Sequence, residues 1–279
     1  MASRLYVPAL AAGWACWAAG GCAYSPSRAP YGKTFYVGGA GNLGPVGTTD
    51  VAFALQLAGY PGQVEPFIWQ SGRGAVSDQL AVGRHLGKAG ELAARMQAYL
   101  DAQPAAPLNV VALSAGCGIT ALAIESLPDR YKLNNVVFLG CSLSSRYDLT
   151  GMLRHLRGSL YVYTSRSDLV LSRILPITGT VDRTQDVAAG LYGFVAPAEV
   201  NEEGRRLYAK LVHIPWRREF IKYGYFGQHI DTVGYRFIRH EVAQRIMTPP
   251  LQGAPAALAR RWGQVGPAAD QPTSAPVQR

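Results

Sequence analysis

Two glycine-rich segments of the sequence hold residues that could do chemistry. Residues 38–44 read GGAGNLG, and their last six residues match the G-x-G-x-x-G pattern of a dinucleotide-binding turn. In the second segment, VVALSAGCG, Ser114 stands between an apolar run and two glycines, Gly116 and Gly118. A serine hydroxyl becomes a good nucleophile when a neighbouring histidine takes its proton. The two segments therefore indicate two different chemistries, nucleotide binding and acyl transfer.

The surroundings of residues 38–44 disfavour the nucleotide interpretation. A dinucleotide site needs a helix that opens on the glycines, so that its first amides hold the pyrophosphate. Here Pro45 follows, and a helical pattern starts only near Thr48. The site also needs an acid at the end of the second strand, but that strand ends in FIWQ and Glu65 lies too early. A nucleotide-dependent oxidoreductase is the less favoured alternative.

Hydrophobic patterning predicts the elements that position these segments. Short apolar runs, most of them continuous as in strands buried on both faces, alternate with helical patterns. The clearest helix has Ser77 as its N-cap and an apolar face that includes Leu92 and Met96. This alternation predicts a doubly wound, mostly parallel α/β sheet with helices on both faces. The predicted strands are 34–37, 64–69, 108–113, 135–139, 159–164 and 211–215, and the predicted helices are 49–57, 77–101, 116–125, 148–156 and 232–246.

Ser114 lies where a predicted buried strand runs directly into a predicted helix. The segment from Ala112 to Gly116 resembles the G-x-S-x-G nucleophile elbow of the α/β-hydrolase family, with Ala112 in place of the first glycine. That turn is so tight that large side chains two residues from the serine would collide, and alanine is small enough to fit. The similar segment GCSLS, residues 140–144, has no helix directly after it. We interpret Ser114 as a nucleophile, and the alternative is a structural serine that caps its helix.

The resemblance implies the partners of Ser114, because the family orders its triad as serine, acid and histidine along the chain. The acid is then Asp168, in the loop after strand 159–164, with Asp182 in reserve. The base is His229, which follows a glycine-rich loop and precedes the last helix. His213 lies within a strand and is expected to be a packed core histidine, whereas His240 is expected on the surface of its helix.

The same resemblance implies an oxyanion hole without a cofactor. One donor is the amide of Ala115, and the other is the amide of Gly39 or Ala40 in the glycine-rich loop. No histidine or cysteine cluster has metal-ligand spacing, so no metal is predicted. The expected activity is that of a serine esterase or lipase-like enzyme on a small-molecule ester or other acyl substrate. Residues 169–210 lack strand patterns and are expected to form a cap or lid.

The N-terminal segment has the layout of an export signal. In residues 1–21, Arg4 precedes an apolar stretch that ends in Gly20 and Gly21, and Cys22 follows. This resembles a bacterial lipoprotein cleavage site, which makes Cys22 the candidate lipidated residue and the lipid the only membrane contact. Plain secretion and an uncleaved anchor stay open. We expect a chain exported to the cell envelope, periplasm or surface, with a linker at 22–33, one α/β-hydrolase domain at 34–247 and a disordered tail at 248–279.

Composition limits the remaining functional classes. The chain has 279 residues, of which 48% are hydrophobic and 16% charged, so it can build a sizeable core and is not disordered over most of its length. The net charge is +9, but no run of five Lys or Arg exists, so no nucleic-acid partner is predicted. Cys117 and Cys141 could pair in an oxidising compartment or stay as two buried small hydrophobes. A non-catalytic binding or surface protein with the same fold is the main alternative to an enzyme.

Overall fold

A parallel β-sheet forms the centre of the molecule, as the strand pattern predicts. The computed structural model describes residues 22–199 and 201–249; the predicted signal and all but two residues of the predicted tail lie outside this part. The strands pair in the order β2-β1-β3-β4-β5-β6, and every ladder is parallel. Their bounds are within two residues of the prediction: β1 Lys33–Val37, β2 Gln63–Phe67, β3 Leu108–Leu113, β4 Val136–Leu139, β5 Leu160–Thr164 and β6 Leu211–Pro215.

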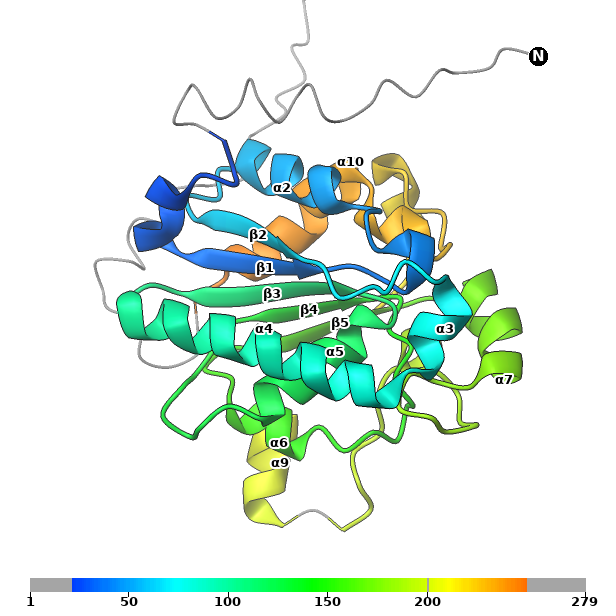
Figure 1. Cartoon of the computed structure of the whole chain (residues 1–279). Helices are drawn as coiled ribbons and strands as arrows, with labels where there is room; N and C mark the ends of the chain where they lie inside the picture. Colours follow the sequence, from blue (N-terminus) through cyan, green and yellow to red (C-terminus); the bar gives the residue numbers. More distant parts are fainter. Residues whose placement is uncertain (1–21, 200, 250–279) are drawn as a thin grey trace, which may run out of the picture.

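Helices cover both faces of this sheet, which confirms the predicted doubly wound α/β class (Figure 1). Helices α2 and α10 lie on one face, and α4, α5, α6 and α9 lie on the other. Two buried hydrophobic clusters fill the spaces between the sheet and these layers. The helices are η1 Pro26–Tyr31, η2 Gly41–Leu43, α2 Thr48–Leu57, α3 Ala75–Leu80, α4 Val82–Ala102, α5 Gly116–Glu125, α6 Thr150–Arg154, η3 Val170–Ile174, α7 Leu175–Thr178, α8 Ala189–Tyr192, α9 Glu202–Tyr208, η4 Arg218–Tyr223, η5 Ile230–Val233, α10 Tyr235–Phe237, η6 Ile238–Val242 and α11 Ala243–Met247.

The strand order reverses between β1 and β3, and this reversal creates the site. The chain leaves β1 through α2 toward β2, but it leaves β3 through α5 toward β4 on the other side. Right-handed crossovers in opposite directions place α2 and α5 on opposite faces of the sheet. In open α/β sheets, ligands bind outside the carboxyl ends of the strands at such a reversal. Residues 38–44 follow β1 and Ser114 follows β3, so both segments lie at this reversal.

The predicted single helix over 77–101 is wrong, because the chain forms two helices there. Helix α3 starts at Ala75, and Ser77 does not cap it. A residue with ψ of 65°, Ala81, separates α3 from α4. The break lets Asp78 accept hydrogen bonds from the backbone of neighbouring loops, while Arg84 donates to the carbonyl of Trp69. The predicted helix 232–246 is interrupted in the same way, because Gly234 has an extended ψ of 135°.

The structure differs from two further expectations, which concern His213 and the segment 22–33. His213 is not a packed core histidine: β6 is an edge strand, and the side chain is exposed and accepts a hydrogen bond from the Phe194 amide (2.9 Å). The expected linker 22–33 contains η1, and Ala23 packs in the hydrophobic cluster that faces α2. Among the described helices, none is long and apolar enough to cross a membrane.

Candidate active site

Ser114 occupies a strained turn at the end of β3. Its φ is +55°, and Arg183 is the only other described non-glycine residue with a positive φ. Its N–H donates to the Leu139 carbonyl (2.9 Å), and its own carbonyl accepts from the Cys117 amide (3.1 Å). A Cβ on Gly116 would lie 2.4 Å from the Val37 carbonyl oxygen, so only glycine fits there. Strain of this kind is stored where surrounding structure fixes it, commonly at functional sites.

Asp168 and His229 form a buried hydrogen-bonded pair. The distance from His229 Nδ1 to Asp168 Oδ2 is 2.7 Å, and the two side chains are 2% and 3% exposed. The other carboxylate oxygen, Oδ1, accepts from the Leu171 amide (3.0 Å). Because a carboxylate only accepts, Nδ1 is the donor in this bond. Nε2 is buried and has no hydrogen-bond partner among the described residues.

Gly140 connects this pair to Ser114. It follows Leu139, whose carbonyl accepts the Ser114 N–H, and it has a φ of +49°. A Cβ on Gly140 would lie 2.9 Å from both Cε1 and Nδ1 of His229 and 3.5 Å from Asp168 Oδ2. The imidazole therefore packs directly on the backbone beside β3. Sequence reasoning discounted this residue, because GCSLS was considered only as a competing serine motif.

The reserve acid lies elsewhere. Asp182 Oδ1 accepts a hydrogen bond from the Ser144 amide (3.0 Å), and no contact joins its carboxylate to His229 in the described chain. The structure thus brings Asp168, and not Asp182, to the histidine.

The glycine-rich loop lies against Ser114. A Cβ on Gly39 would be 3.2 Å from the Ser114 Cβ, which shows how closely the loop approaches. Gln70 Nε2 donates to the Gly39 carbonyl (2.6 Å), and Trp69 Nε1 donates to the Gly38 carbonyl (2.8 Å). The amides of Gly39, Ala40 and Ala115 have no acceptor within the described residues. All three are therefore available to a ligand oxygen, so the choice between Gly39 and Ala40 stays a prediction.

A buried carboxylate fixes the shape of this loop. Asp78 accepts hydrogen bonds from the amides of Gly41 (2.9 Å) and Ser71 (2.8 Å). Burial acts to raise the pKa of Asp78, but these hydrogen bonds and the charge of Arg84 outweigh it and hold the pKa below its ordinary value. The group is thus an anion that ties the loop to α3. Nothing in the sequence pattern singled out Asp78, because its partners come from two distant loops.

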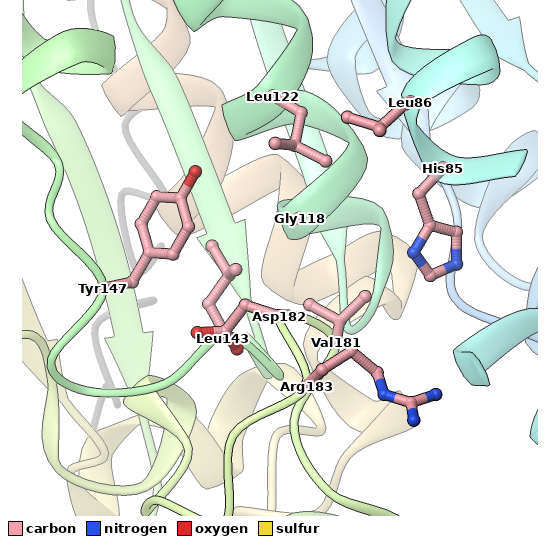
Figure 2. A pocket seen from close by; sticks show the side chains of 9 residues that line it. All are labelled: His85, Leu86, Gly118, Leu122, Leu143, Tyr147, Val181, Asp182 and Arg183. Atoms are coloured by element: carbon pink, nitrogen blue, oxygen red, sulfur yellow. The ribbon is translucent and has the colours of Figure 1, made fainter. Parts of the chain in front are cut away.

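A cavity of about 190 Å³ lies alongside α5 (Figure 2). Its wall is mostly apolar, and Gly118, one helical turn beyond Ser114, forms part of it. The side chains come from α4, α5, the loop after β4 and the turn at 181–183: His85, Leu86, Leu122, Leu143, Tyr147, Val181, Asp182 and Arg183. A space of this size holds a group about as large as one aromatic ring.

The cysteines and the metal prediction can be placed on the structure as well. Cys22, Cys117 and Cys141 are all buried free thiols, so Cys117 and Cys141 are not paired. Burial and the neighbouring Cys141 thiol raise the pKa of Cys117 well above its ordinary value, which keeps the thiol protonated. No group of three or more His, Cys, Asp or Glu within the described residues could hold a metal ion. Lipidation of Cys22 stays a prediction.

Comparison with known proteins gives only a distant structural likeness. No known protein family matches the sequence, and no curated protein matches it. Among solved structures, the chain is similar to an acetylxylan esterase determined at 0.90 Å resolution, with a TM-score of 0.40 and 14% sequence identity. The match covers 85% of this chain and 99% of the esterase chain. A likeness this distant says nothing of the activity of the present chain.

Proposed function

We propose that the protein is a serine hydrolase that cleaves an ester or other acyl bond through an acyl-enzyme. The observation that carries the proposal is the buried Asp168–His229 pair, whose unpaired Nε2 lies on a ring packed against Gly140, beside the strained turn of Ser114. The combination of a base, a group that orients it and a serine on a tight turn is that of a nucleophile–base–acid triad.

In this mechanism His229 Nε2 takes the proton of the Ser114 hydroxyl as Oγ attacks the substrate carbonyl carbon. The Asp168 carboxylate, already bonded to Nδ1, stabilises the imidazolium that forms. The unpaired amides of Ala115 and Ala40 are the proposed donors to the carbonyl oxygen as it becomes negative. The imidazolium then protonates the leaving alcohol. A water molecule then gives its proton to His229 Nε2 as it attacks the acyl carbonyl carbon, and the carboxylic acid leaves as Ser114 regains its proton.

A fluorophosphonate probe tests the nucleophile directly, because it labels only an activated serine. The wild-type protein should be labelled, and Ser114→Ala should abolish labelling. Ser142→Ala is a matched control: Ser142 is also buried, its amide donates to the Ser114 carbonyl (3.4 Å), and it belongs to the similar GCSLS segment. This variant should still be labelled. Absence of labelling in the folded wild type would refute the hydrolase and favour the non-catalytic binding protein.

Export with a lipid on Cys22 is the cellular part of the proposal. The support is the sequence of residues 1–22 alone. Globomycin should block processing of the precursor if Cys22 is lipidated, whereas plain secretion would proceed in its presence.

A further inference from the structure

The described surface carries its exposed large apolar side chains unevenly. Of fifteen such residues, nine lie in segments 68–86, 169–195 and 226–230, which follow the carboxyl ends of β2, β5 and β6. These nine are Ile68, Val76, Leu86, Leu169, Val187, Tyr192, Val195, Phe226 and Ile230. Scattered exposed apolar residues are ordinary, but a concentration around one site indicates an interaction surface.

Three of these side chains are tied directly to the catalytic pair. Leu169 follows Asp168 and Ile230 follows His229, so the 2.7 Å bond between the pair joins the two segments that carry these exposed side chains. The Phe226 amide donates to Asp231 Oδ2 (3.1 Å), which ties the backbone at Phe226 to the residue after Ile230. These residues form one side of the rim around the site.

Other segments continue this rim. Val76 follows Ala75, whose backbone nitrogen would be only 2.4 Å from a Cβ on Gly41. The start of α3 is therefore packed on the glycine-rich loop. On another side, the Arg166 guanidinium lies 5.1 Å from the centre of the Tyr192 ring. Figure 1 shows α3 and α7 at the end of the sheet to which the strand arrows point.

The arginines of the rim are more exposed than its acids. Segments 70–86, 165–187 and 224–232 contain five arginines, all exposed: Arg73, Arg84, Arg166, Arg173 and Arg183. The five acids of the same segments are buried or half-buried: Asp78, Asp168, Asp182, Asp186 and Asp231. Asp182 and Asp231 accept from backbone amides, and Asp186 accepts from the Ser144 hydroxyl (2.8 Å). An apolar rim fringed by arginines complements a surface of acyl chains under anionic headgroups.

We propose that this rim docks on an anionic lipid surface and that the substrate is an acyl ester resident in that surface. The proposal rests on the hydrolase function for its substrate and on the rim for its docking. The apolar side chains enter the acyl boundary, the arginines contact phosphate groups, and the ester reaches Ser114 without passing through bulk water. Ala23 pairs with the start of β2, at the opposite edge of the sheet, so docking by the rim does not use a lipid on Cys22.

Vesicle binding of the full chain tests the docking surface. The wild type should bind vesicles of equal phosphatidylglycerol and phosphatidylcholine more tightly than vesicles of phosphatidylcholine alone. Phe226→Glu should weaken binding to the anionic vesicles by about tenfold or more, because the aromatic ring that enters the acyl boundary on docking is exchanged for a charge. In the wild-type background, the double variant Arg73→Gln/Arg173→Gln should weaken binding by about fivefold for each arginine. It should also reduce the preference for anionic vesicles.

Phe53→Glu is the matched control for Phe226→Glu. Phe53 is 54% exposed and Phe226 is 59% exposed, but Phe53 lies on α2 and is not one of the nine rim residues; its ring packs against Tyr235, with 6.4 Å between the ring centres. Both variants have the same residues 1–22, so any contribution of this segment to vesicle binding is common to them. Equal weakening by the two substitutions would overturn the proposal, and so would unchanged binding by Phe226→Glu.

Activity separates this proposal from the hydrolase proposal. Phe226→Glu should lose more activity on an ester carried in anionic vesicles than on a soluble acetate ester, whereas Phe53→Glu should keep the wild-type ratio of the two activities. A wild type that is labelled by fluorophosphonate but does not bind vesicles refutes the docking surface alone. A wild type that binds vesicles through the rim but is never labelled refutes the hydrolase alone.

Discussion

The substitution Gly140→Ala examines how the backbone positions the histidine. The new methyl carbon would lie 2.9 Å from His229 Cε1 and Nδ1, whereas non-bonded atoms of this kind prefer about 3.5 Å. The imidazole would have to move by about 0.6 Å. Because a misplacement of about 1 Å can reduce a rate by about 10²-fold, we expect kcat/KM to fall by about ten- to a hundredfold.

The control for this substitution is Gly224→Ala. Gly224 also has a positive φ, +83°, but a Cβ there would meet nothing within 4 Å. Alanine in the left-handed region costs about 1–2 kcal/mol at either position. For a domain of this size that corresponds to about 2–8 °C in Tm. The two variants should therefore lose similar stability from backbone strain, while only Gly140→Ala loses activity beyond it.

The assay is hydrolysis of a soluble chromogenic ester, measured at a temperature where circular dichroism shows both variants folded. A folded Gly140→Ala protein with kcat/KM within about twofold of wild type would refute the placement of His229 on Gly140. Equal loss of activity in Gly224→Ala would show that strain, and not the clash with the imidazole, is responsible.

Three further predictions follow from the same site. Asp168→Asn should lower kcat by about 10⁴-fold while Asp182→Asn stays near wild type, and the reverse ranking in steady-state kinetics would make Asp182 the acid. Ala40→Pro should remove one oxyanion donor and lower kcat by about 10²–10³-fold with little change in Tm, because Ala40 already has a φ of −71°; unchanged kcat would exclude this amide. Burial, together with the charge of Asp148, raises the pKa of Glu125 to about 7 although Tyr147 donates to it (2.8 Å). The folded state then binds more protons than the unfolded state from about pH 4.5 to about 7, so the free energy of unfolding should fall as pH rises through this window. The urea midpoint should fall between pH 5 and pH 8 in the wild type, and it should fall less in Glu125→Gln. An equal fall in the two proteins would contradict the raised pKa of Glu125.

The positions of the strands and of Ser114 could be predicted from the sequence because their signals are local. Strands buried on both faces need continuous apolar runs, and β3 and β6 have the predicted bounds. The turn at Ser114 needs small residues two positions away on either side, and Ala112 and Gly116 supply them. The positive φ of Ser114 agrees with that reasoning.

The helix break at Ala81 could not be predicted, because its cause is not local. A helical pattern continues through residues 77–101, but Asp78 bonds to amides at positions 41 and 71. Those bonds become available only when the two loops have been brought to the carboxyl edge of the sheet. Exposure of His213 has a similar origin, because strand order makes β6 an edge.

The sequence by itself determined the parallel sheet, the turn at Ser114 and a short list of acids and histidines. Only the tertiary structure decided which acid meets His229, since the two residues are 61 positions apart and β5 and the last loop must converge. It also decided that the backbone at Gly140 packs against the imidazole of His229. Local patterns encode which element a residue joins, whereas contacts between carboxyl-end loops depend on strand order, and strand order is a property of the whole sheet.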